Sequence, residues 1–307
     1  MFGENHAHIF MNAVNYRQAV RKHENGVDEE VIHSHFRAYQ EKNISFVRDG
    51  GDNLQVSKRA KELAGEYGID YRTPVFAIHR KGHYGGIVGR GFENLKEYAA
   101  LVKEAGAQGG DFIKIMTTGI MDFNTDGSVT ETPLSFGEVK EMVHIAHEEG
   151  FSVMAHTNGA RAVREVVEAG ADSVEHGNYV DGETIQAMAE SDVVWVPTIT
   201  VVKNMIGCGR FSDKVLKKIW ETGSRNIRSA FARGVHMALG SDAGAYRVYH
   251  GQGLADEWNC FKEILGDSQK NSRDSKEINR YHDGRENIRR TQNGQKKIFC
   301  AERTYLL

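Results

Sequence analysis

Short apolar runs alternate with longer amphipathic segments through the first 265 residues of the chain. The runs are rich in β-branched residues and contain few polar ones, which is typical of strands in a buried parallel sheet. This pattern predicts eight strands, at residues 6–10, 44–48, 73–78, 111–116, 152–156, 173–176, 193–198 and 235–240.

Helical signals occupy the segments between the runs. In 135–150, apolar residues recur at spacings of three and four, Ser135 and Glu138 form a capping box, and Gly150 follows the last turn. Further helices are predicted at 27–42, 56–67, 92–105, 160–169, 182–190, 213–233 and about 254–265. Eight strand–helix units predict an α/β protein with a (β/α)8 TIM barrel over residues 1–265. A doubly wound open sheet is the alternative, but the chain has no Gly-rich phosphate turn after the first strand.

The remaining residues, 266–307, break the pattern, because residues 266–297 are nearly all polar. Such a segment buries too little apolar surface to offset its ordering entropy. We expect a polar C-terminal tail that is either a helical cap or disordered, and an altered reading frame stays open as a third explanation.

Composition narrows the classes of partner. The chain has 307 residues, 40% of them hydrophobic, and a formal net charge of −3, so it has no basic field for nucleic acid or anionic membranes. No apolar run approaches the ~20 residues that span a bilayer, and MFGENHAH is not a signal peptide. Cys208, Cys260 and Cys300 are few and far apart, which favours reduced thiols in a cytoplasmic protein.

Candidate metal ligands lie at or near the ends of the apolar runs, namely His6, His8, Lys114, His156, His176 and Asp242. His6 and His8 share one face of a strand because the strand period is two. Since parallel barrel strands all end at one face, the six side chains can meet there. Their ligand types suit Zn²⁺, although Mn²⁺, Fe²⁺ or Co²⁺ also fit.

Lys114 stands inside an apolar strand, where a charged amine costs several kcal/mol unless it is neutralised or paired. Three interpretations stay open: a lysine that reaches solvent at the strand's mouth, a Schiff-base lysine, and a carbamate, formed with CO2, that bridges two cations.

Two further patterns are interpreted as decoys. His33 and His35 also form a His-x-His pair, but in a predicted helix, where residues two apart diverge. Residues 122–127 begin like a calcium loop, but Pro133 stands where the loop needs glutamate. We expect loop 117–131 to arch over the site instead.

The stretches NHAHIF, FIKIMTTG, AHTNGARAV, EHGNYVD and LGSDAG resemble the amidohydrolase superfamily, most closely its prolidase- and imidazolonepropionase-related dipeptidase branch. The resemblance implies two divalent metal ions held in a shared centre, and the ligand types favour Zn²⁺. One ion is held by His6, His8 and Asp242, the other by His156 and His176, and a carboxylated Lys114 bridges both. It further implies hydrolysis of an amide (C–N) bond in a small substrate such as a dipeptide or N-acyl amino acid, by hydroxide formed at the metals, with Asp242 as general base and acid.

The resemblance also suggests substrate contacts. His83, in a Gly-rich loop, matches a histidine that contacts the scissile group, and Tyr179 could bind a substrate carboxylate. Most members of the superfamily carry a β-sandwich that this chain is expected to lack for the most part. A homo-oligomer that covers the exposed barrel surface is therefore expected.

Three alternatives stay open. A mononuclear deaminase typically has no bridging lysine and has glutamate in an HxxE motif, where this chain has Gly159. A lactonase or phosphotriesterase-like hydrolase could use the same metals, since loops set specificity. The third is an inactive, truncated barrel. The substrate, the metal and the oligomeric state are not fixed by the sequence.

Overall fold

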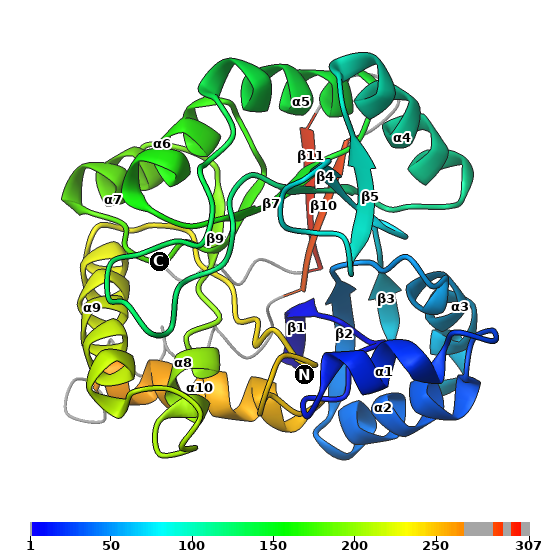
Figure 1. Ribbon diagram of the computed structural model, residues 1–307, viewed down its shortest axis with the longest axis horizontal. Helices are drawn as coiled ribbons and strands as arrows, with labels where there is room; N and C mark the ends of the chain where they lie inside the picture. Colours follow the sequence, from blue (N-terminus) through cyan, green and yellow to red (C-terminus); the bar gives the residue numbers. More distant parts are fainter. Residues whose placement is uncertain (1, 267–284, 291–295, 302–307) are drawn as a thin grey trace.

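The structure is a computed structural model that describes residues 2–266, 285–290 and 296–301. Parallel strands form its centre, and helices surround them (Figure 1). The first sheet contains β1 (Phe2–Ala7), β2 (Ile44–Asp49) and β3 (Asp70–Arg72). The second has the order β5 (Gly89–Phe92), β4 (Ala77–Arg80), β6 (Ile113–Met116), β7 (Val153–Thr157), β8 (Ser173–His176), β9 (Val194–Val196).

Hydrogen bonds connect the two sheets on both sides. Residues 235–243 run between β9 and β1: Met237 bridges Trp195, Ala243 bridges Ala7, and the amide of Asn5 donates to the carbonyl of Leu239 at 3.0 Å. On the other side, the amide of Asp52 donates to the carbonyl of Val75 at 3.1 Å. The arrangement is an α/β fold of the TIM-barrel type, as predicted.

The helices form an outer ring that packs on the strands through apolar stripes (Figure 1). Those that the sequence predicted are α2 (Glu29–Glu41), α3 (Val56–Leu63) with the 3-10 turn η1 (Ala64–Tyr67), α4 (Leu95–Ala107), α5 (Phe136–Glu148), α6 (Ala160–Glu168), α7 (Gly182–Ala189), α9 (Asp213–Ala232) and α10 (Gln252–Leu265). Two short helices, α1 (Tyr16–Lys22) and α8 (Thr200–Met205), were not predicted. The hydroxyl of Ser135 caps α5 through the amide of Glu138, as the capping box predicts.

The predicted strand 73–78 is wrong in its extent. Residues 73–76 separate β3 from β4, because Pro74 has no amide hydrogen to donate and Val75 takes a left-handed φ of 67°. The sequence also missed β5, which pairs with β4 on the side away from β6. Gly89 permits that approach, since a Cβ there would lie 2.0 Å from the carbonyl oxygen of Ala77.

Within the predicted tail, the structure describes two strands, β10 (Arg285–Arg290) and β11 (Lys296–Ala301), which pair in antiparallel fashion. These segments differ from the helix or disorder expected there. The rest of that tail lies outside the described residues. Across the described part of the chain, every helix is too short or too polar to cross a bilayer.

Candidate metal centre

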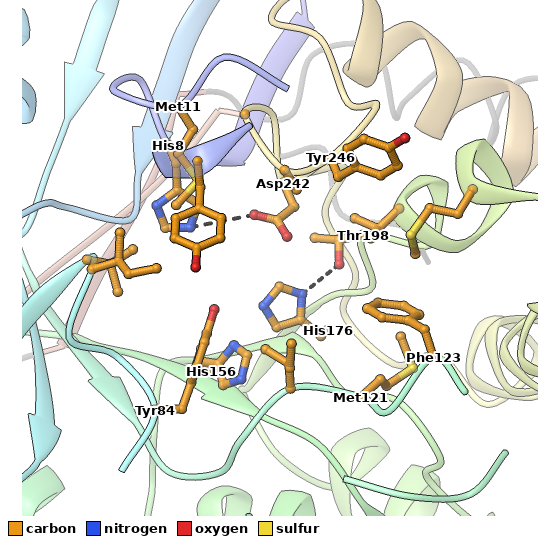
Figure 2. A pocket seen from close by; sticks show the side chains of 18 of the residues that line it. His8, Met11, Tyr84, Met121, Phe123, His156, His176, Thr198, Asp242 and Tyr246 are labelled. Atoms are coloured by element: carbon orange, nitrogen blue, oxygen red, sulfur yellow. Dashed lines mark hydrogen bonds and ion pairs between the residues drawn. The ribbon is translucent and has the colours of Figure 1, made fainter. Parts of the chain in front are cut away.

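The six predicted ligands meet at the carboxyl ends of the strands. Asp242 Oδ1 lies 3.6 Å from His6 Nε2 and 3.5 Å from His8 Nε2, and Lys114 Nζ lies 3.2 Å from His6 Nε2. The imidazole of His176 lies close to two other candidate ligands. Its centroid is 4.9 Å from that of His6 and 4.6 Å from that of His156. Figure 2 shows His8, His156, His176 and Asp242 around one space.

Glu175 fixes the orientation of the His6 imidazole through a hydrogen bond to Nδ1. Its carboxylate accepts a hydrogen bond from His6 Nδ1 at 2.6 Å, and also contacts Arg48 Nη2 at 2.7 Å and Ser173 Oγ at 2.6 Å. Since the carboxylate accepts, the proton of the neutral imidazole is on Nδ1 and its lone pair is on Nε2. The lone pair therefore faces Asp242 and Lys114, as a metal ligand requires.

His156 and His176 are oriented by the loops above them. His156 Nε2 lies 3.2 Å from the carbonyl oxygen of Gly119, which can only accept, so the neutral ring has its lone pair on Nδ1. His176 Nδ1 makes a 2.7 Å hydrogen bond with Thr198 Oγ1. Burial lowers the pKa of His156 to about 3, which keeps the ring neutral and able to bind a cation.

The backbone turns sharply at two of the ligands. His176 and Asp242 have left-handed φ values of 66° and 62°. Neighbouring residues in a strand point to opposite faces, yet both Glu175 and His176 contact His6. The left-handed conformation at the end of β8 redirects the His176 side chain and brings both residues to one site.

Lys114 is buried, with 1% of its surface exposed. Burial lowers the pKa of its amine from 10.5 to about 8, although Glu175 and Asp242 partly counteract the shift. A lowered pKa increases the fraction of the amine that is neutral, and the neutral amine is the form that reacts with CO2. The buried position of Lys114 and the lowered pKa of its amine are both compatible with the carbamate interpretation.

The residues fit a cation on structural grounds. His6 Nε2 presents a lone pair 3.6 Å from Asp242 Oδ1 in a buried site, so one cation could contact both atoms. His6, His8 and Asp242 offer ligand atoms that all lie within 4.8 Å of one another. Nitrogen and oxygen donors of this kind suit Zn²⁺ and related divalent ions.

A cavity of about 670 Å³ opens onto this group. Its floor includes His8, Lys114, His156, His176 and Asp242, and its walls are mainly apolar. Met121 and Phe123, from the loop after β6, form part of one wall (Figure 2). Part of loop 117–131, which was predicted to arch over the site, thus forms a wall of the cavity.

The two predicted substrate residues lie elsewhere. His83 is outside the cavity lining, its side chain is 34% exposed, and its Nδ1 lies 3.7 Å from Glu131. Tyr179 packs with the apolar cluster around Met121 and Leu216, also outside the lining.

Several site residues were missed by sequence reasoning. Tyr84, the neighbour of His83, lines the cavity, with its ring centroid 5.3 Å from that of His156. Arg48 and Glu175 are charged residues inside predicted strands, the same signal that singled out Lys114. Arg210 also lines the cavity but follows α8 in a segment without a recognisable pattern.

Comparison with known proteins gives the family and the fold. At 28% identity over 180 residues, the chain is similar to an uncharacterized protein of Mycobacterium tuberculosis, an alignment that covers 56% of the chain and 47% of that protein. It is 27% identical to ochratoxinase of Aspergillus niger over 191 residues, covering 60% of the chain and 38% of the enzyme. The chain thus spans less than half the length of these curated relatives.

Solved structures with the same fold include a Xaa-Pro dipeptidase with bound methionine in its active site, at a TM-score of 0.70 and 22% identity, covering 92% of this chain and 76% of that one. The A. niger ochratoxinase structure also has a TM-score of 0.70, at 19% identity, covering 86% of this chain and 66% of that one. The family model described as "Amidohydrolase family" matches residues 4–267. The chain therefore belongs to the amidohydrolase family.

Proposed function

We propose that the protein is a binuclear metal-dependent amidohydrolase that cleaves an amide bond in a small substrate such as a dipeptide or N-acyl amino acid. The observation that carries the proposal is the buried Lys114 amine, 3.2 Å from a metal-binding nitrogen of His6, in the middle of four histidines and Asp242. A carbamate there would supply an anionic oxygen to each of two cations, with His6, His8 and Asp242 holding one, and His156 and His176 the other.

When bound, two divalent ions, of which Zn²⁺ suits the donors best, polarise the scissile carbonyl and lower the pKa of the attacking water. Asp242 lies at the cavity floor, where its carboxylate can take a proton from that water and pass it to the departing nitrogen. Burial raises the pKa of the Asp242 carboxyl group to about 7, and the charge of Lys114 counteracts the shift. Burial therefore makes this carboxylate a stronger base. Tyr84 borders the same floor beside His156, where its hydroxyl can orient the substrate.

Among proteins of this fold, the Xaa-Pro dipeptidase supports a dipeptide or a similar amide as the substrate. The competing functions are a mononuclear deaminase and a lactonase or phosphotriesterase-like hydrolase on the same residues. In the deaminase pattern, glutamate would stand at Gly159, whose φ of 89° suits glycine and strains a side chain.

Two measurements test the proposal. Metal analysis of the purified protein should give close to two ions per subunit, whereas close to one would favour the deaminase. A library of dipeptides and N-acyl amino acids, assayed with Zn²⁺, should contain hydrolysed members. Hydrolysis of lactones with no cleavage of any amide would replace the proposed reaction with that of a lactonase.

A further inference from the structure

Arg210 is a cation that lines the cavity. It lies in the segment between α8 and α9. Within residues 2–266, no carboxylate lies within ion-pair distance of its guanidinium, unlike exposed arginines such as Arg59 and Arg161, which pair with glutamates. The positive charge is therefore available to a ligand in the cavity.

Two aromatic rings position the guanidinium. Its central carbon lies 4.6 Å from the ring centroid of Tyr246 and 5.2 Å from that of Phe211, and both rings also line the cavity. Stacking on aromatic rings engages the face of the guanidinium and leaves the N–H groups at its edge free. That edge matches the two oxygens of a carboxylate.

An apolar wall continues from the arginine toward the metal-binding group. The ring of Phe211 lies 5.3 Å from that of Phe123, and Met121 and Met205 line the cavity near them. Figure 2 shows Phe123, Met121 and Tyr246 on the side of His176 and Asp242, away from Tyr84. A cation and an apolar surface thus adjoin on one side of the reacting centre.

We propose that the substrates of this site carry a free carboxylate held by Arg210 and, beside it, a large apolar side chain packed against Phe123 and Phe211. The proposal rests on the proposed function: the released amino acid of the amide substrate bears both groups. We therefore expect the site to favour N-acyl amino acids and dipeptides that end in phenylalanine or leucine. Substrates that end in glycine, or whose carboxylate is blocked, should be cleaved less well.

The carboxylate is tested with N-acetyl-L-phenylalanine and its primary amide, by the release of acetate. Wild type should prefer the free acid by at least about tenfold in kcat/KM. Arg210→Gln should lose about 10-fold to 100-fold on the acid, mainly through KM, and leave the amide unchanged, since one charge-assisted contact is removed. Arg161→Gln, on the outer surface of α6, is the matched control and should change neither. Equal losses on both substrates in Arg210→Gln, or equal activity of wild type on both, would overturn the carboxylate assignment.

The apolar wall is tested with N-acetylglycine beside N-acetyl-L-phenylalanine. Wild type should favour the phenylalanine compound, and Phe123→Ala should reduce that preference several-fold with unchanged metal content. An unaltered preference would remove Phe123 from the proposed wall.

Binding measurements separate this proposal from the proposed function. The ketomethylene isostere of N-acetyl-L-phenylalanine cannot be hydrolysed, and calorimetry gives its Kd beside that of its amide. Tighter binding of the acid in wild type, lost in Arg210→Gln, supports the carboxylate site even if no amide is cleaved. If amides are cleaved but both isosteres bind equally well, the proposed function stands and the carboxylate site is wrong.

Discussion

Asp242 is proposed both as a metal ligand and as the proton carrier, so its removal should reduce turnover by more than the loss of metal explains. Asp242→Ala is expected to abolish turnover, with kcat at least about 10²–10⁴ lower, because among the residues that the structure describes no other carboxylate lines the cavity to move the proton. Turnover and metal content should be measured on the same preparation. Activity within tenfold of wild type, at any metal content, would contradict the role as proton carrier.

Glu175 should act on metal affinity through His6. Glu175→Gln removes the negative charge that holds His6 Nδ1–H and leaves the buried Arg48 without its ion pair. Metal affinity, measured by competition with a chelator, should fall about 10-fold to 100-fold, as for other residues that orient ligands.

The matched control for this change is Glu183→Gln, because that side chain is 83% exposed and pairs with Arg164 on the outer surface. It should leave metal affinity unaltered. An unchanged affinity in Glu175→Gln would show that His6 binds without its support.

The sequence predicted that the six candidate ligands lie close together, but it did not predict the residues that orient them. Each ligand ends or interrupts an apolar run, so local pattern and chain order were sufficient to group them. Arg48 and Glu175 lie 127 positions apart and meet only across the barrel interior. Tyr84 lines the cavity and His83 does not. Which of these neighbours faces the cavity depends on the conformation of one loop, and hydrophobic periodicity does not encode it.

At the scale of elements, amphipathic helices were predicted more accurately than strands. A helix of ten or more residues repeats its apolar stripe several times, but the strands here contain three to six residues. The pattern consequently missed the interruption at Pro74 and the glycine-rich β5. It also missed α8, which has only six residues.

Helix α8 depends on a buried carboxyl group from α10. Glu257 accepts hydrogen bonds from the amides of Ile199 and Thr200 at 3.1 and 2.7 Å, at the amino end of α8. Burial raises the pKa of Glu257 to about 8, and the two amide hydrogen bonds counteract the shift. Glu257→Ala leaves two buried amides without an acceptor and should lower the free energy of unfolding by about 2–4 kcal/mol, as measured by urea denaturation.

Glu263→Ala, on the same helix, is the control for this substitution. Glu263 is 55% exposed and pairs with Lys203, so its removal should change stability by less than about 1 kcal/mol. Equal effects of the two substitutions would contradict the proposed support of α8.

At the scale of the molecule, metal ions bound at the proposed centre should stabilise the whole barrel. The proposed ligands come from β1 and the residue after it, β6, β7, β8 and the segment 235–243, so one bound centre would connect elements from residue 6 to residue 242. Since bound ions stabilise only the folded state, removal by a chelator should lower Tm by on the order of 5 °C or more. Added Zn²⁺ should restore it.

A thermal melt of His8→Ala provides the comparison for that experiment. The variant lacks one ligand, so the chelator should shift its Tm less than that of wild type. Removal of all measurable metal without any change in the Tm of wild type would show that the barrel is stable independently of its site.

The left-handed backbone at His176 and Asp242 bears on how such a sequence changes over generations. For residues other than glycine and asparagine this conformation costs roughly 1–2 kcal/mol, and aspartate tolerates it better than histidine. A substitution at either position that relieves this backbone strain would therefore stabilise the folded protein, but it would also remove a proposed metal ligand. Under selection for folding alone, these two positions would be among the first to change to glycine or asparagine.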